Sequence, residues 1–310
     1  MPAGGSSIYT DAEGYQDSLR GTIDLLVERP REFHARLTWA ELPRLRLVRA
    51  RESSARLAYV TLPVGSVSVT FTTDRGSTLI CDGNEVRFGD ILFHGSGDRL
   101  HQRTTGPTRW GSILLTPATL VAFGATIMGR ILTPPSVRQI LRPLPVDRRL
   151  LLRLHAQAGR MAETVPERIG HREVVRALEQ DLLLALLNCL AGRDVCGSCQ
   201  QPSVLVQLET MLSANHRRLL TVKEISKALG ISPQRLRTIC SSRLGMSPGR
   251  YQRLRRLKLV RAKLMLAGSE RTSIVEIMQH YGFADIHRFV TEYRDAYGEM
   301  PPMPSGRIDR

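Results

Sequence analysis

Hydrophobic and polar residues follow two different periods along this chain, and the change of period divides it. From about residue 45 to residue 115, apolar and polar residues alternate in short runs that Gly, Pro and Asp interrupt. Short alternating runs separated by turn formers are typical of an antiparallel barrel or sandwich. The stretch before them is largely polar and contains one candidate helix, residues 13–28. The pattern therefore predicts a β domain over about residues 40–116.

Apolar residues recur at helical spacing after this β domain. Thr116 and Pro117 suit a helix cap and first turn, and helices are expected over residues 117–191. The last of them carries a wide apolar stripe, which must be buried against the β domain or against the same helix of a second subunit. Residues 192–203 are small and aperiodic, so they mark the expected boundary between an N-terminal domain, 1–200, and a helical domain, 201–303.

The first of two similar helical segments covers residues 221–245. Thr221 and Glu224 fit a capping box, and Gly230 ends the first helix in a tight turn. Ser232 then caps a second helix. A helix, a short glycine turn and a capped second helix are the parts of a helix-turn-helix unit.

The same construction returns in residues 272–298. Gly282 makes the turn, Asp285 caps the second helix, and Phe289 anchors it. A long helix over about residues 247–267 joins the two units. Twenty helical residues span roughly 30 Å, close to the ~34 Å between successive major-groove faces on one side of DNA. The two recognition helices are therefore expected to enter adjacent major grooves.

Charge points to the partner of this domain. Residues 201–310 hold 19 Lys and Arg against 9 Asp and Glu, whereas residues 1–200 hold 25 against 20. Such an excess favours a polyanion, with nucleic acid first and an anionic membrane surface second. No apolar run reaches the roughly 18 residues of a membrane span, and no secretory signal is recognisable. We expect a cytoplasmic protein without a membrane partner.

The C-terminal segments resemble the DNA-binding domain of the AraC/XylS family of bacterial transcription regulators. The resemblance covers about residues 219–301 and rests on positions at the family's spacing: Leu236, Gly245, Pro248, Tyr251, Arg256, Ile277, Gly282, Phe283, Phe289, Tyr293, Gly298 and Pro301. It implies an α+β protein of two domains: a cupin-like N-terminal β-barrel with flanking helices, and an all-α C-terminal domain with two helix-turn-helix units.

The resemblance also implies a function and partners. The function is sequence-specific transcription regulation, with double-stranded DNA as the partner and an N-terminal domain that senses a small-molecule effector or forms a homodimer. RNA polymerase is a further partner if the protein is an activator. No motif indicates a cofactor or an effector-binding residue, although Trp39, Phe93, His94 and Trp110 are candidates for lining a pocket.

Base-reading residues are expected on the outward face of each second helix, because packing fixes the inward face. They are Gln234, Arg235, Arg237, Thr238 and Ser241 in the first unit and Ile286, His287 and Thr291 in the second. Arg bridges guanine and Gln bridges adenine in the major groove. Phosphate contacts are expected from Arg250, Arg253, Arg256 and Arg288.

Two alternatives involve other chemistry. Cys196 and Cys199 form a C-x-x-C, and Cys189 supplies a third sulfur for a redox- or metal-responsive regulator; otherwise the pair belongs to a plain linker. A cupin-type metalloenzyme would use His94 and His101, but the closely spaced His pair and the Glu of a cupin metal site are missing. No Ser-His-Asp, P-loop or Rossmann pattern occurs either. We therefore expect no enzyme and no metal site.

Overall fold

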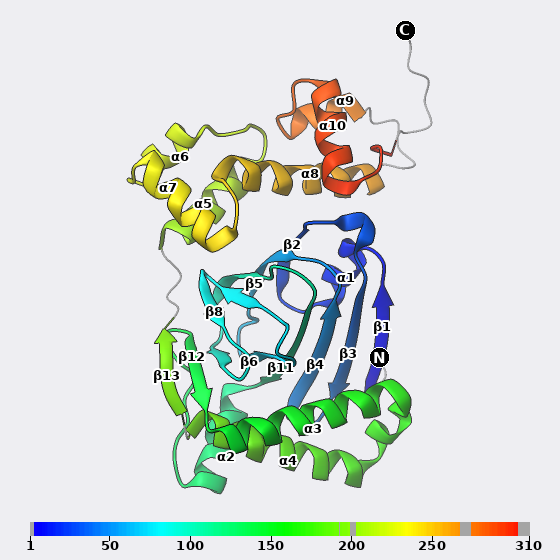
Figure 1. Ribbon diagram of the computed structural model, residues 1–310, viewed down its shortest axis with the longest axis vertical. Helices are drawn as coiled ribbons and strands as arrows, with labels where there is room; N and C mark the ends of the chain where they lie inside the picture. Colours follow the sequence, from blue (N-terminus) through cyan, green and yellow to red (C-terminus); the bar gives the residue numbers. More distant parts are fainter. Residues whose placement is uncertain (1–2, 192, 199–202, 267–273, 303–310) are drawn as a thin grey trace. The chain divides into compact units, whose positions relative to one another are not determined.

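The structure is a computed structural model that describes residues 3–191, 193–198, 203–266 and 274–302. It is α+β, with two antiparallel sheets and several helices before residue 200 and helices in the described residues after it (Figure 1). The chain divides into two compact units, residues 1–27 with 32–200 and residues 28–31 with 201–310. Among the described residues, no helix is both long and apolar enough to cross a bilayer.

The first unit contains an eight-stranded and a five-stranded sheet. The eight-stranded sheet has the order β1 (Gly4–Tyr9), β3 (Ala35–Glu41), β4 (Leu45–Glu52), β11 (Thr108–Leu115), β6 (Val67–Thr72), β9 (Ile91–His94), β12 (Gln139–Pro143) and β13 (Arg193–Ser198). The five-stranded sheet has the order β2 (Thr22–Val27), β5 (Arg56–Thr61), β10 (Arg99–Arg103), β7 (Leu79–Cys81) and β8 (Asn84–Val86).

Alternation along the strands gives the larger sheet two apolar faces. In β4, Leu45 and Leu47 belong to one core cluster, whereas Val48 and Ala50 belong to another. The first cluster includes residues of α2 (Pro117–Met128), α3 (Pro145–Thr164) and α4 (Arg172–Ala191). Figure 1 shows α3 and α4 lying across the sheet. The second cluster includes Leu25 and Ala58 of the smaller sheet, so it lies between the sheets.

The apolar stripe of α4 is buried within its own chain. Leu182, Leu186 and Leu187 have no exposed surface, and they pack in the cluster shared with the sheet. Of the two partners that the sequence left open for this stripe, the β domain of the same chain is therefore the one observed. The homodimer stays a prediction.

Three sequence expectations for this unit need correction. Residues 13–28 are not one helix: α1 (Ala12–Ser18) ends early, and β2 follows and pairs with β5. The aperiodic stretch after residue 191 contains β13, which pairs with β12. The predicted barrel is not closed, because each sheet ends in two separate edge strands. The cupin-like character stays a prediction.

The described part of the second unit consists of helices and the turns between them. They are α5 (Ser203–Ala214), α6 (Val222–Ala228), α7 (Pro233–Leu244), α8 (Pro248–Leu266), α9 (Ile274–His280) and α10 (Ile286–Tyr297). The long helix predicted over 247–267 is α8, which contacts α7, α9 and α10. The fold class is therefore confirmed as α+β, with the two predicted helix pairs on either side of α8.

The two turn glycines differ in what surrounds them, which gives a matched test of the fold. Gly230 and Gly282 have φ of 65° and 81°. A Cβ at Gly230 would meet nothing within 4 Å, whereas one at Gly282 would lie 2.9 Å from the carbonyl oxygen of Arg217. We expect Gly230→Ala to lower the free energy of unfolding by about 1 kcal/mol through the left-handed backbone alone. Gly282→Ala should cost about 2–4 kcal/mol, because overpacking adds to that strain.

Urea denaturation followed by circular dichroism measures both variants, and hydrogen exchange assigns each loss to its own helix pair. Equal losses at the two glycines would show that the backbone around Gly282 is not packed as described.

Candidate nucleic-acid interface

Local caps fix the start of both helices in the first helix-turn-helix unit. The backbone N–H of Glu224 donates to Oγ1 of Thr221 (3.2 Å), and the backbone N–H of Thr221 donates to Oε2 of Glu224 (2.7 Å). The hydrogen bond from the Thr221 backbone is the main reason that the pKa of Glu224 falls to about 2. Ser232 Oγ accepts from the backbone N–H of Arg235 (3.1 Å) at the start of α7. The predicted capping box and cap are confirmed.

The recognition helix α7 has one buried face and one exposed face. Leu236, Cys240 and Leu244 have no exposed surface. The five residues predicted to read bases are all exposed: Gln234, Arg235, Arg237, Thr238 and Ser241. The hydroxyl of Thr238 donates to the carbonyl oxygen of Gln234 (3.1 Å), so its hydrogen is engaged within the helix. The face is available to a groove, and the base-reading role of its residues stays a prediction.

The second recognition helix, α10, begins at a carboxylate cap. Asp285 Oδ1 accepts from the backbone N–H groups of His287 (2.8 Å) and Arg288 (3.1 Å). These bonds, led by the one from Arg288, lower the pKa of Asp285. Phe289 and Tyr293 are completely buried in the core around α8 and α9. The predicted cap and anchors of this helix are confirmed.

The outward residues of α10 are less uniform than those of α7. His287 and Thr291 are exposed, and the Thr291 hydroxyl donates to the carbonyl oxygen of His287 (2.9 Å). Ile286 is half-buried and packs against the core cluster that contains Phe289. Only part of the Ile286 side chain therefore remains for a thymine methyl group.

Three of the four predicted phosphate contacts are exposed. Arg250 lies in the first turn of α8 and is open to solvent. Arg253 and Arg288 are also exposed, but both approach one carboxylate: Glu292 Oε1 lies 3.6 Å from Arg253 Nη1 and 2.9 Å from Arg288 Nε. Glu292 therefore offsets part of the positive charge that these two arginines would present to DNA.

Arg256 contradicts its predicted role as a phosphate contact. Its side chain lies on the buried face of α8, and the residue is only 3% exposed. Nη1 donates to the carbonyl oxygen of Tyr281 and Nη2 to that of Asn215, both at 2.6 Å. Burial is the main cause that lowers the pKa of Arg256, to about 10, so the guanidinium stays charged at neutral pH. Arg256 is therefore a structural cation whose guanidinium is engaged inside the domain.

Helix α5 contributes a buried carboxylate that the sequence reasoning missed. Glu209 is 3% exposed and accepts from the Tyr251 hydroxyl and from Arg255 Nη1, both at 2.6 Å. These contacts join α5 to α8 and hold Arg255 within the domain. The available signal was the single acidic residue in the otherwise uncharged stretch 203–214.

The first unit contains a small cavity between its sheets. Its volume is about 70 Å³, and His94 and Trp110 are among its lining residues. Phe93 packs instead in the cluster on the helix side of the larger sheet. Burial lowers the pKa of His94 to about 4, so its imidazole is neutral at physiological pH. Two of the four aromatic and His candidates for a pocket therefore lie at this cavity.

The described residues give little support to a redox- or metal-responsive role for the cysteines. Cys189 is fully buried in α4, and burial is the main cause that raises the pKa of its thiol to about 12, which keeps it protonated. Cys199 lies outside the described residues, so the C-x-x-C with Cys196 stays a prediction. Within the described ranges, no three His, Cys, Asp or Glu side chains gather as a metal site would require.

Comparison with known proteins gives matches concentrated at the C-terminus. A family model described as a helix-turn-helix domain matches residues 225–302. The "XylDLEGF operon transcriptional activator 2" of Pseudomonas putida is 32% identical over 90 residues, 29% of this chain and 57% of that protein. The "XylDLEGF operon transcriptional activator" of the same species is 32% identical over 119 residues, 38% of this chain and 36% of that protein. The chain thus spans about half, or less, of the length of these relatives.

A solved structure is similar over more of the chain. It is the "AraC-like transcriptional activator CuxR", at 16% identity, with 84% of this chain and 94% of that chain covered and a TM-score of 0.41.

The buried position of Arg256 predicts an effect on stability rather than on DNA affinity. Arg256→Lys keeps the charge but cannot serve two carbonyl oxygens with a planar fork. We expect the free energy of unfolding to fall by about 1–3 kcal/mol, the cost of an unsatisfied buried polar group. Arg256→Gln removes the charge, and in the folded variant the salt dependence of DNA binding should still not change, because Arg256 contacts no phosphate. A slope that falls by about one counterion in Arg256→Gln would instead return Arg256 to the phosphate-contacting set.

The position of Glu292 predicts a gain in affinity when its charge is removed. Glu292→Gln frees Arg253 and Arg288 from their shared carboxylate. Its affinity for random-sequence DNA at low salt should therefore rise about 3- to 10-fold, and this increase should disappear at high salt. Asp295→Asn is the matched control, because it removes the same charge from the same helix. Equal effects of the two variants in a fluorescence anisotropy titration would mean that only net charge matters.

Proposed function

We propose that the whole chain is a sequence-specific transcription regulator of the AraC/XylS type, from the premise that residues 225–302 match a family model described as a helix-turn-helix domain. The two curated relatives described above are transcriptional activators by name, and such regulators are not an enzyme family. The single observation that best supports the proposal is the pair of capped recognition helices, α7 and α10, carried by one connecting helix.

The connecting helix has the length that the proposal needs. With 19 residues, α8 is about 28 Å long. Successive major-groove faces on one side of DNA are ~34 Å apart, which is close to the length of α8. We infer that α7 and α10 of one chain enter adjacent major grooves.

In this proposal, one set of residues reads bases and another contacts phosphates. The outward residues of α7, with Arg237 foremost, read bases, together with His287 and Thr291 of α10 and the exposed part of Ile286. Arg250, Arg253 and Arg288 contact phosphates. Most hydrogen bonds between protein and DNA go to the backbone, so affinity should depend steeply on salt.

The N-terminal unit has the regulatory role in this proposal. It senses a small-molecule effector or forms a homodimer, and a homodimer would double the number of recognition helices on an operator. An activator of this kind would contact RNA polymerase. The support is the β architecture, which encloses a cavity and presents further hollows on its surface. The thiol- or metal-responsive alternative has no supporting observation among the described residues.

The split between base readers and phosphate contacts predicts different outcomes for two arginines. An operator is first selected from a random DNA pool with the full chain. Arg237→Ala should then weaken binding to the selected site about 10- to 100-fold, the loss of one bidentate base contact, and leave random DNA nearly unaffected. Arg250→Ala should weaken binding to both DNAs alike and lower the salt slope by about one.

Anisotropy titrations at several salt concentrations measure both quantities. If Arg237→Ala weakened binding to both DNAs by the same factor, Arg237 would not read a base.

A further inference from the structure

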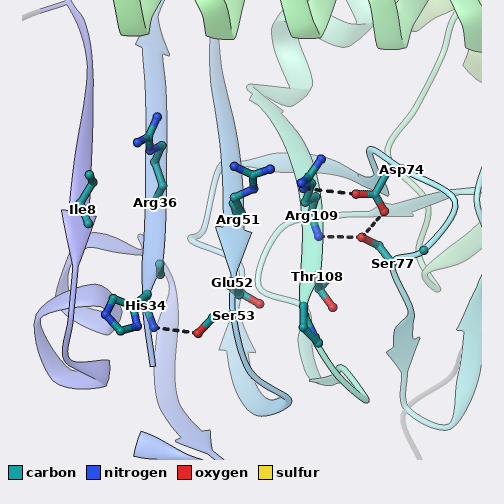
Figure 2. Close-up of a pocket in the computed structure, with 13 residues that line it drawn as sticks. Ile8, His34, Arg36, Arg51, Glu52, Ser53, Asp74, Ser77, Thr108 and Arg109 are labelled. Atoms are coloured by element: carbon teal, nitrogen blue, oxygen red, sulfur yellow. Dashed lines mark hydrogen bonds and ion pairs between the residues drawn. The ribbon is translucent and has the colours of Figure 1, made fainter. Parts of the chain in front are cut away.

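Three arginines lie side by side on the outer face of the eight-stranded sheet. Arg36 of β3 is directly opposite Arg51 of β4, and Arg51 is directly opposite Arg109 of β11. Ile8 of β1 continues the same row at the sheet edge. Figure 2 shows the four side chains in line across four neighbouring strands. We call Arg36, Arg51 and Arg109 the arginine row.

The arginine row is poorly neutralised by the protein. Like charges directly opposite each other on neighbouring strands are destabilising. Asp74 lies 3.4 Å from Nε of Arg109, but its Oδ1 also accepts from the Ser77 hydroxyl (2.6 Å). Within the described residues, the exposed side chains of Arg36 and Arg51 have no ion pair or hydrogen bond. One carboxylate therefore faces three guanidinium groups.

Positive charge continues behind the row. Arg49 of β4 and Arg160 of α3 line a neighbouring cavity of about 200 Å³ that also includes all three arginines of the row. Burial lowers the pKa of Arg49, and the neighbouring arginines act in the same direction, against Glu163. Glu163 also accepts a hydrogen bond from the Thr38 hydroxyl (2.7 Å). The whole patch thus carries five arginines against Asp74 and Glu163; the third acidic residue of its lining, Glu52, is buried in an ion pair with Arg56.

The surface in front of the row is hollow. A cavity of about 680 Å³ is lined by the three arginines together with His34, Asp74, Ile8 and Pro107, among others. Sites for small molecules usually measure about 300–1,000 Å³. The cavity between the sheets measures only about 70 Å³. The outer hollow therefore suits a small organic ligand better in size, and it offers an apolar wall beside a cationic one.

We propose that the arginine row binds a small molecule that carries two or more oxyanion groups, phosphate or carboxylate. Guanidinium groups recognise both by paired N–H···O bonds. Adjacent strands are about 4.8 Å apart, so the row extends over roughly 10 Å from Arg36 to Arg109. A ligand with anionic groups spaced within that length would neutralise the repulsion that the sheet register imposes. That this ligand is the regulator's effector rests on the function proposed above; the binding itself does not.

A DNA backbone is the competing polyanion for this patch. A phosphate backbone would be held by charge alone, whereas the arginine row lies in a hollow of small-molecule size whose lining also includes the apolar Ile8 and Pro107. The geometry therefore favours a small ligand, and DNA binding is treated as an outcome of the test.

Isothermal titration calorimetry of the full chain tests the site with two probes, inorganic triphosphate and citrate. We expect at least one probe to bind with a dissociation constant below about 1 mM, and the preferred probe shows whether phosphate or carboxylate is recognised. Arg51→Gln should weaken that binding at least 10-fold. Arg87→Gln is the control, since it removes an exposed arginine that pairs with Glu85 elsewhere on the unit, and it should change affinity less than 2-fold.

Circular dichroism first confirms that both variants are folded, and Arg36→Gln repeats the test at a second position of the row. The proposal is overturned if neither probe binds the unmodified chain, or if Arg51→Gln and Arg87→Gln have equal effects. It is also overturned if Arg51→Gln weakens binding to random DNA as Arg250→Ala does, because the patch would then be a DNA surface. Calorimetry needs no DNA, so a failure of the proposed DNA-binding function would leave this result interpretable.

Discussion

The arrangement of the helix-turn-helix domain depends on one buried cation. Arg256 projects from the middle of α8 and donates to the carbonyl oxygens of Asn215, which follows α5, and Tyr281, which follows α9. A buried charge is tolerated only when such partners replace water. The guanidinium also explains Gly282: a Cβ there would lie 2.5 Å from Arg256 Nη1. The turn before α10 is therefore shaped around Arg256, and the direction in which α10 leaves that turn follows from it.

Local features of the C-terminal domain could be predicted from sequence because their partners are close along the chain. The capping box joins residues three apart, Asp285 caps residues two and three positions later, and Gly282 needs only its own backbone. Arg256 could not be predicted in the same way. Its acceptors lie 25 and 41 residues away, and among neighbouring arginines it resembled a phosphate contact. Inward and outward faces were predictable, but a buried cation on the inward face was not.

In the N-terminal unit, even more of the structure depends on residues far apart in the sequence and could not be predicted. Strand β1 has the sequence GGSSIY, which lacks an apolar alternation, and it forms because β3 pairs with it. The arginine row depends entirely on register: residues 36, 51 and 109 become neighbours only when three strands align. Each arginine alone has the sequence character of a solvated surface residue. Together they place a concentrated charge on a sheet, unlike the cations of the helix-turn-helix domain, which are spread along helices.

Hydroxyl-radical footprinting of the full chain on DNA selected from a random pool tests the central claim, that one polypeptide reads two adjacent major grooves. The account predicts, for each bound chain, two protected segments on one face of the helix, centred about 10–10.5 base pairs apart. A deletion or insertion of five base pairs between them should abolish one of the two contacts. A single protected segment per chain, unaffected by that change of spacing, would contradict the account.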